Sequence, residues 1–229
     1  MGKNLRQQRR GKGSQRYRSP SHRFLGEVRY ADIDKKEGVV VDIIDAPGRS
    51  IPLAVVKYQD GKELMIPSEG LSVGEKVGYN IEIKNGAILK IADIPEGTKI
   101  YNIEIQPKDG GKLCRASGVS ATIITKGKDK TVIQLPTGIL KTIPNECRAT
   151  IGVVAGSGRP DKPFLKAGNK FFAWRAKGKY YPTVKGVSKN PLDHPFGGKT
   201  KPGKHKTVSR HMPPGKKVGS ISPRRTGKK

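Results

Sequence analysis

The sequence predicts an all-β protein of two small barrels with a polycationic segment at each end. Short β-branched runs separated by turn residues fill residues 38–155, and no apolar spacing of helical type lasts three turns there. Composition changes sharply outside that range, where lysine, arginine, glycine and proline dominate. The 229 residues allow one or two domains, and the runs fall into two sets of about five.

The first set of runs covers residues 38–94. Its members are VVVDIID, PLAVVKY, LMIP, EKVGYNIEI and AILKIA. Asp60-Gly61 and Asn85-Gly86 are dipeptides that two-residue hairpins prefer, because both positions tolerate positive φ. Five short strands joined in this way predict a closed or nearly closed barrel.

The second set of runs covers residues 99–155. Its members are KIYNIEIQ, ATIITKG, TVIQLPTG, ILKTIP and ATIGVVAG, and tight turns are expected at KGKDK (126–130) and PTG (136–138). The boundary between the barrels is expected near Pro95–Thr98. Each barrel would have a small core, so we expect bound partner surface to contribute to its stability.

Charge is concentrated at the two ends of the chain. The net charge is +27; residues 1–26 contain eight lysines and arginines and no acid, and residues 176–229 contain fifteen and one acid, Asp193. Such segments bury too little apolar surface to fold alone, so we expect disorder in isolation and order on a partner. Solubilising tails are the alternative, but solubility does not require one sign of charge at both ends. A polyanionic partner is therefore predicted.

Nucleic acid fits this partner better than a membrane does. The longest apolar runs, such as Ile151–Ala155, are far shorter than the roughly 20 residues of a membrane-spanning helix. The N-terminus has no apolar stretch of the kind found in secretory signals, and no long amphipathic helix is evident.

The cysteines and histidines predict neither a disulfide scaffold nor a metal site. Cys114 and Cys147 are too few and too far apart for either, which favours a reduced, intracellular chain. The four histidines lack the close spacing of zinc ligands; they are His22, His194, His205 and His211.

The stretch NPLDHPFGG (190–198) is a catalytic candidate because it contains an Asp193–His194 pair. It has no GxSxG nucleophile elbow near it, and its lysine-rich surroundings cannot form a dry pocket. We therefore expect a compact turn in which Asp193 orients His194 toward a phosphate or a base. Gly197 and Gly198 would let the backbone approach nucleic acid closely.

Two other stretches carry basic candidates. GSGRPD (156–161) lacks the complete P-loop pattern and is better explained as a loop leaving the last strand, from which a basic strip extends: Arg159, Lys162, Lys166 and Lys170. Five aromatics in residues 169–186 alternate with cations, which suits base stacking; they are Phe171, Phe172, Trp174, Tyr180 and Tyr181. Anchoring of some of these rings on the second barrel is an equally good interpretation.

Three stretches of the chain resemble one known family. NECRATIGVVAGSGRPDKPFLKAGNK (145–170), VKGVSKNPLDHPFGG (184–198) and RGKGSQRYRSPSHR (10–23) are similar to the universal large-subunit ribosomal protein L2 family in its archaeal and eukaryotic form. The resemblance implies an OB-like barrel, an SH3-like barrel and basic irregular extensions that thread into 23S-type rRNA near the peptidyl transferase region. It also implies support of subunit association, tRNA binding and peptide bond formation.

The same resemblance implies a non-enzyme in the cytoplasmic ribosome. The chemistry there belongs to RNA, although the histidine matching His194 has been considered a contributor. Partners would be large-subunit rRNA, other ribosomal proteins and the small subunit, and the cofactor would be none, apart from Mg²⁺ ions bridging to rRNA. Ser188, Lys189, Phe196 and Lys199 depart from the family's usual residues, and Phe196 removes a second histidine.

Resemblance and residues together predict four segments and one set of contacts. The segments are a basic rRNA-binding arm (1–37), an OB-like barrel (38–96), an SH3-like barrel (97–170) and a basic C-terminal extension (171–229). The predicted rRNA-binding residues are Arg9, Arg10, Arg16, Arg18, Arg23, Lys112, Arg115, Lys141, Arg148, Arg159, Lys166, Lys170, Arg175, Lys185, Asn190, His194, Gly197, Gly198, Lys199, Lys204, Arg210, Arg224 and Arg225.

Two rival functions stay open at this level. A hydrolase or transferase that uses Asp193, His194 and a serine would turn over substrate by itself. A translation factor or general nucleic-acid chaperone with the same barrels would bind many RNAs with little preference.

Overall fold

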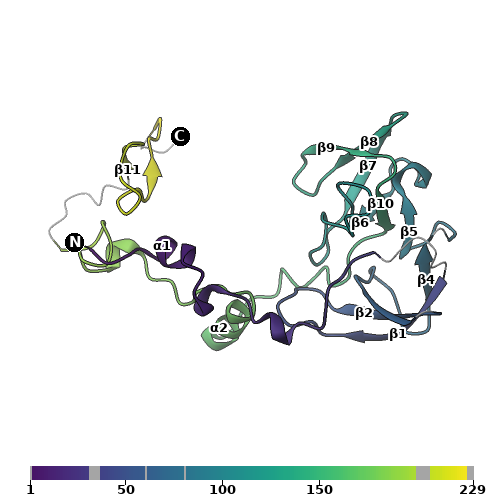
Figure 1. The fold of residues 1–229 in the computed structure, drawn as a ribbon, viewed down its shortest axis with the longest axis horizontal. Helices are drawn as coiled ribbons and strands as arrows, with labels where there is room; N and C mark the ends of the chain where they lie inside the picture. Colours follow the sequence, from purple (N-terminus) through teal and green to yellow (C-terminus); the bar gives the residue numbers. More distant parts are fainter. Residues whose placement is uncertain (1, 31–36, 60, 80, 200–206, 226–229) are drawn as a thin grey trace. The chain divides into compact units, whose positions relative to one another are not determined.

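The computed structural model describes residues 2–30, 37–59, 61–79, 81–199 and 207–225 (Figure 1). The chain forms two compact units: residues 21–165 make one, called here the barrel unit, and residues 1–20 with 166–229 make the other, called the arm unit. Asp60 of the predicted hairpin dipeptide, Lys204 of the predicted rRNA-binding set and His205 lie outside the described residues.

The barrel unit contains all ten predicted strands, which confirms the all-β prediction. Its strands are β1 (Glu37–Ile44), β2 (Leu53–Tyr58), β3 (Gly61–Met65), β4 (Lys76–Tyr79), β5 (Ala87–Lys90), β6 (Lys99–Tyr101), β7 (Ala121–Lys126), β8 (Lys130–Gln134), β9 (Leu140–Pro144) and β10 (Arg148–Ile151). Two single-turn 3₁₀ helices accompany them, η2 (Ser21–Arg23) and η3 (Ile91–Asp93).

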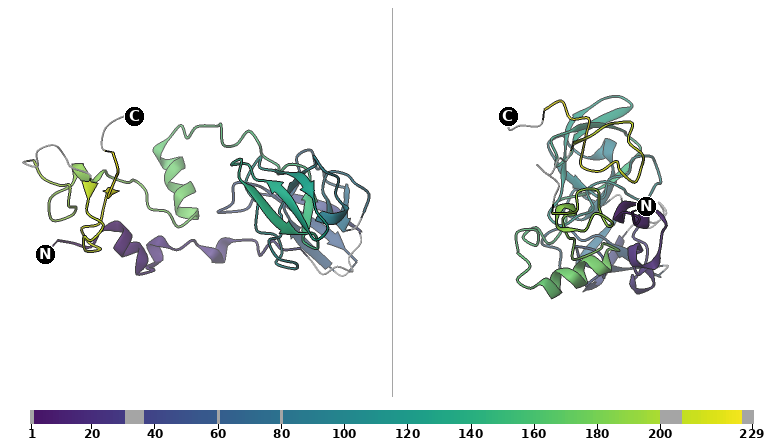
Figure 2. Two further views of the ribbon diagram at one scale, coloured as in Figure 1. Left: turned by 90° about the horizontal axis from the view of Figure 1, so that it is seen from above. Right: turned by 90° about the vertical axis from the view of Figure 1, so that its left-hand side faces the viewer.

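One hydrogen-bonded sheet joins both sets of strands. Its order is β3-β2-β1-β4-β5-β10-β6-β7-β8-β9, so β5 of the first set pairs with β10 of the second, antiparallel, with Leu89 opposite Ala149. Figure 2 shows the chain from two further sides. Strand β5 therefore connects the two barrels directly, beyond the covalent link.

Side-chain alternation along β5 supplies the two larger of the three apolar clusters in the barrel unit. Ile88 packs in the core with Val40, Val56 and Val77. Ala87 and Leu89 point to the opposite side and pack in the core of the second barrel, with Ile100, Ile123, Ile133 and Ile143. The two cores thus share a strand, and the predicted boundary near Pro95–Thr98 and the four-segment division stay predictions.

The turns test the hairpin predictions individually. Gly127 N–H donates to Lys130 O at 2.8 Å between β7 and β8, and Gly138 N–H donates to Leu135 O at 2.8 Å between β8 and β9, which confirms the turns at 126–130 and 136–138. The prediction of a hairpin at Asn85-Gly86 is wrong, because β4 and β5 are parallel. Gly86, with φ of +87°, instead completes a turn that leads into β5.

The arm unit contains short elements that the sequence did not reveal. They are α1 (Arg6–Gly11), η1 (Gln15–Tyr17), α2 (Ala167–Ala176), η4 (Gly186–Ser188), and the parallel pair β11 (Thr207–Val208) and β12 (Ser220–Ile221). Helix α2 contains no buried residue and has no apolar stripe, so periodicity could not predict it. It also runs across residue 170, the predicted end of the second barrel.

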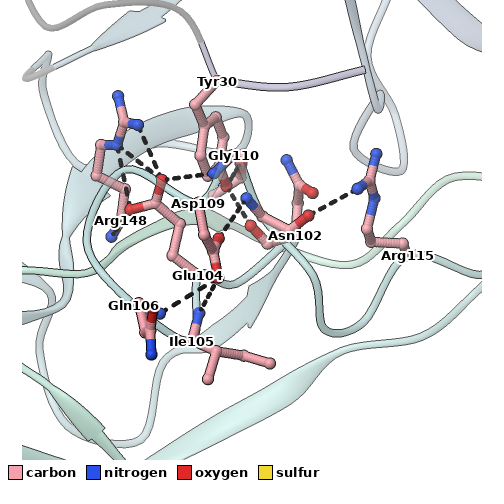
Figure 3. Close-up of polar contacts among 11 residues, drawn as sticks. Tyr30, Asn102, Glu104, Ile105, Gln106, Asp109, Gly110, Arg115 and Arg148 are labelled. Atoms are coloured by element: carbon pink, nitrogen blue, oxygen red, sulfur yellow. Dashed lines mark hydrogen bonds and ion pairs between the residues drawn. The ribbon is translucent and has the colours of Figure 1, made fainter. Parts of the chain in front are cut away.

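A buried ion pair joins β10 to the loop that follows β6 (Figure 3). The Glu104 carboxylate is fully buried and accepts from the Arg148 guanidinium, with Arg148 Nη2 to Glu104 Oε1 at 2.8 Å, and from Gly110 N–H at 3.1 Å. The Tyr30 ring centroid lies 5.2 Å from the guanidinium carbon, and Tyr30 Oη donates to Asn102 O at 2.7 Å. The segment before β1 is thereby fixed to the second barrel.

Buried phenols and thiols predict loss of stability in alkali. Burial raises the pKa of Tyr30 and Tyr101 well above the usual range, that of Cys114 to about 11 and that of Cys147 to about 12. Unfolding restores ordinary values, so this stability is fully present below pH ~8 and declines as pH rises, by up to ~1.4 kcal/mol per pH unit for each titrating group.

Urea unfolding of the full chain between pH 8 and 11.5 measures this decline. We expect Tyr101→Phe to make it shallower, although the variant also loses the hydrogen bond to Ile66 O at 3.1 Å. An unfolding free energy that is constant across this range would contradict the prediction.

Candidate nucleic-acid interface

Contacts within the arm unit bring together two segments far apart in sequence. Arg6 Nη1 donates to Thr183 Oγ1 at 2.8 Å. The rings of Tyr17 and Tyr180 are stacked, with centroids 6.3 Å apart and an interplanar angle of 29°. The Arg16 guanidinium carbon lies 4.3 Å from the centroid of Tyr180, on the ring's face. The N-terminal arm and residues 180–189 therefore form one surface.

This surface encloses a cationic hollow, called here the arm hollow. It has a volume of about 300 Å³ and is lined by Arg6, Arg9, Lys12, Ser14, Arg16, Tyr17, Tyr180 and Lys189. Five of these eight residues are cations and none is an acid. A guanidinium group can donate two parallel hydrogen bonds to the oxygens of one phosphate, and phenol rings stack on bases. The hollow is therefore suited to a nucleic-acid strand.

The stretch around Asp193–His194 forms the predicted compact turn. Asp193 N–H and His194 N–H both donate to Asn190 O, at 3.0 and 3.1 Å, and Gly198 N–H donates to Lys189 O at 3.1 Å. Gly197 lies so close to the carbonyl oxygens of Asn190 and Lys189 that it has no room for a Cβ. The turn thus requires glycine and holds Lys189 beside the arm hollow.

The His194 ring lies against Phe196 and Gly186. Phe196 N–H donates to His194 Nδ1 at 3.0 Å, and the two rings are 5.0 Å apart. The ring packs directly over Gly186. Asp193 Oδ1 lies 3.5 Å from Lys3 Nζ instead, so orientation of His194 by Asp193 stays a prediction. A neutral ring that accepts at Nδ1 carries its proton on Nε2.

Most predicted rRNA-binding residues lie at the surface. The exposed ones are Arg9, Arg10, Arg16, Arg18, Arg23, Lys112, Arg159, Lys166, Arg175, Lys185, Asn190, Gly198, Lys199, Arg210, Arg224 and Arg225. Arg115, Lys141, Lys170 and His194 are half-buried, and Arg148 and Gly197 are buried. Of this set, the arm hollow brings together Arg9 and Arg16.

The aromatic cluster contains both exposed and cation-bound rings. Phe172 is 66% exposed, and Phe171 contacts it edge to face at 5.4 Å. Lys170 Nζ lies 5.5 Å from the Trp174 ring and 5.4 Å from the Tyr181 ring. Both interpretations of these aromatics stay open.

Comparisons with known proteins agree with the geometry. Residues 2–78 match the family described as Ribosomal Proteins L2, RNA binding N-terminal domain, and residues 84–217 match Ribosomal Proteins L2, C-terminal domain. The chain belongs to the ribosomal L2 family. Proteins named large ribosomal subunit protein uL2 are similar along the full chain: 54% identical in Methanothermobacter thermautotrophicus and 50% in Methanosphaera stadtmanae, each over 100% of both chains. The uL2 protein of Natronomonas pharaonis is 48% identical over 100% of this chain and 97% of its own.

In this L2 chain, two side chains that were predicted to bind RNA contact other parts of the protein. Arg148 is 8% exposed and paired with Glu104, so it stabilises the second barrel and does not face outward as predicted. Arg115 donates to Gly111 O at 2.6 Å and to Val28 O at 2.7 Å, which ties the segment before β1 to the second barrel. Charge alone could not distinguish these arginines from exposed ones.

Three lining cations of the arm hollow were absent from the prediction: Arg6, Lys12 and Lys189. Arg6 and Lys12 belong to the same basic run as the predicted arginines, which was a usable signal. Lys189 could not be chosen in this way, since its proximity to α1 depends on tertiary contacts.

Within the described part of the chain, no three histidine, cysteine or acidic side chains gather as a metal site would require. No helix there is long and apolar enough to span a membrane.

Proposed function

We propose that this chain is a structural constituent of the large ribosomal subunit that binds large-subunit rRNA through its basic arms. The arm hollow carries the proposal, because two distant segments converge there to present five cations and two phenol rings without an acid. The relatives' names, which place those proteins in the large subunit, support the same conclusion.

In this proposal the arm unit binds near the peptidyl transferase region and thereby supports subunit association, tRNA binding and peptide bond formation. The rRNA performs the chemistry, and the protein positions the rRNA. His194, whose Nδ1 accepts from Phe196 N–H, would donate to a phosphate or stack on a base. Other ribosomal proteins are further partners, and Mg²⁺ ions bridge the arms to rRNA.

Binding to rRNA fragments across a salt series tests the proposal. We expect the full chain to retain one large-subunit fragment against unrelated competitor RNA, with a steep loss of affinity as salt rises. A variant carrying Arg9→Gln, Arg16→Gln and Lys189→Gln should reduce the slope of log affinity against log salt by about 2–3, because each lost phosphate contact removes ~1.

A control variant with the same loss of charge isolates the arm hollow. Lys57→Gln, Lys62→Gln and Lys99→Gln remove three exposed lysines of the barrel unit and should leave the slope nearly unchanged. If the chain loses affinity for every RNA equally as salt rises, the chaperone alternative is favoured. Substrate turnover that His194→Ala abolishes would favour the enzyme alternative.

A further inference from the structure

The first residues of the chain lie against the turn at 190–198. Lys3 N–H donates to Leu192 O at 2.8 Å, and Lys3 Nζ lies 3.5 Å from Asp193 Oδ1. The backbone at Gly2 also passes close to the turn, because a Cβ built there would be 3.2 Å from Leu192 O. Residues 2–5 are called here the N-terminal strap. The strap and the turn both belong to the arm unit.

The strap and the turn's internal hydrogen bonds use different groups. Inside the turn, backbone N–H groups donate to the carbonyl oxygens of Lys189, Asn190 and His194. Lys3 instead contacts Leu192 O and the Asp193 carboxylate. Contact with the strap therefore adds to the internal bonds of the turn and does not replace them.

The strap is itself held in place, through Leu5 and α1. Leu5 is 4% exposed, and Val218, at 7%, is the other buried apolar side chain among the described residues of the arm unit. Leu5 N–H donates to Gln8 Oε1 at 2.8 Å, and Leu5 O accepts from Arg9 N–H at 2.9 Å. Burial removes the leucine side chain from water, which opposes fraying of this end of the chain. Lys3 thus lies next to an anchored segment.

Asp193 is the only acid in the sequence of the arm unit. A carboxylate there repels the phosphates that the surrounding cations attract, so it lowers affinity for RNA unless a cation neutralises it. Lys3 supplies that cation. The Lys3 and Asp193 side chains are 62% and 35% exposed, and an ion pair this exposed adds little stability by itself. The pair is therefore suited to fixing the register between strap and turn, while the backbone bond and Leu5 supply most of the attachment.

The strap connects two parts of the lining of the arm hollow. It leads directly into α1, whose Arg6 and Arg9 line the hollow, and it contacts the turn that holds Lys189 at the same hollow. Lys189 O accepts from Gly198 N–H at 3.1 Å, so a shift of the turn moves Lys189 with it. The distance between Lys189 and the α1 arginines consequently depends in part on the contact between Lys3 and the turn.

We propose that Lys3 is a positioning residue for rRNA binding. By contacting Leu192 O and Asp193, it fixes the turn at 190–198 against α1 and sets the spacing of the cations in the arm hollow. Asp193 acts in this arrangement as the partner of Lys3. The inference rests on the proposed function and deepens it, because it assigns the geometry of the hollow to the first residues of the chain.

Exchange of the two charges tests the pair in the full chain. We expect Lys3→Glu to weaken binding of the selected rRNA fragment about tenfold, because like charges then push the strap away from the turn. Adding Asp193→Lys to Lys3→Glu restores an attractive pair with reversed polarity and the original net charge. This double variant should bind the fragment within about threefold of the unmodified chain.

Lys217→Glu is the matched control, because it removes the same charge from another exposed lysine of the arm unit. Combined with Asp193→Lys it also restores the net charge, but the effects of these two substitutions should simply add. Equal recovery of affinity in the two double variants would show that net charge alone decides affinity, and it would overturn the proposal. Weakening by Asp193→Asn without any effect of Lys3→Gln would also overturn it, since Asp193 would then act through His194.

Hydrogen exchange of the free full chain reports on the turn without RNA. We expect the amides of residues 190–198 to exchange about threefold to tenfold faster in Lys3→Glu, and at the original rate in Lys3→Glu with Asp193→Lys. If the unmodified chain selects an rRNA fragment and Lys3→Glu leaves the exchange rates unchanged, only the positioning role is wrong. If the unmodified chain binds every RNA equally, the proposed function is wrong, and the exchange rates still decide whether Lys3 fixes the turn.

Discussion

Replacing Glu104 by alanine should lower the free energy of unfolding by about 3–5 kcal/mol, because a buried guanidinium loses its partner. Glu104 is completely buried, and its carboxylate accepts hydrogen bonds from the Arg148 guanidinium and from the Arg148 backbone N–H, the latter at 2.9 Å. Truncation would also leave Gly110 N–H without its acceptor. Urea unfolding followed by tyrosine fluorescence and circular dichroism measures the change.

Two further variants separate the charge from the volume lost. Glu104→Leu with Arg148→Met removes both charges and should recover most of the lost stability, since well-packed apolar residues often replace a buried ion pair at no net cost. Glu82→Ala removes an exposed carboxylate and should change stability by less than about 0.5 kcal/mol. A loss below 1 kcal/mol for Glu104→Ala would mean that water or another group satisfies Arg148.

The strands were predictable because their signals are local. β-branched runs and the turns at Gly127–Lys130 and Gly138 need only a few neighbouring residues to form. The Asn85-Gly86 dipeptide misled for the same reason: it reports a local preference for positive φ, whereas the direction of β5 is set by pairing with β4 and β10. Helix α2 was missed because its residues form no apolar stripe.

The site was predictable in composition but not in geometry. A basic run predicts phosphate contact, yet Arg148 carries the same charge and is buried against Glu104, 44 residues away in sequence. The arm hollow depends on a contact between Arg6 and Thr183, 177 residues apart. The L2-like motif located the turn at 190–198, although the role of Lys189 beside α1 required the tertiary structure.

Replacing Gly197 by alanine should weaken binding of the selected rRNA fragment about tenfold or more without changing the urea unfolding of the barrel unit. The added Cβ would overlap the carbonyl oxygens of Asn190 and Lys189, so the turn must open. Opening displaces Lys189 from the arm hollow and His194 from Phe196, and each lost hydrogen bond from a charged group to phosphate costs ~1.5–3 kcal/mol. Fragment binding at fixed salt measures the effect.

Gly168→Ala is the matched control, because it makes the same chemical change within the arm unit. Gly168 lies in α2 with no atom near the position of a new Cβ, and alanine favours a helix, so rRNA affinity should be unaffected. Neither substitution alters the net charge. A loss confined to Gly197→Ala would therefore show that rRNA is recognised by the shape of the turn, whereas equal affinities would mean that the arm binds as a flexible polycation whose turn has no part in recognition.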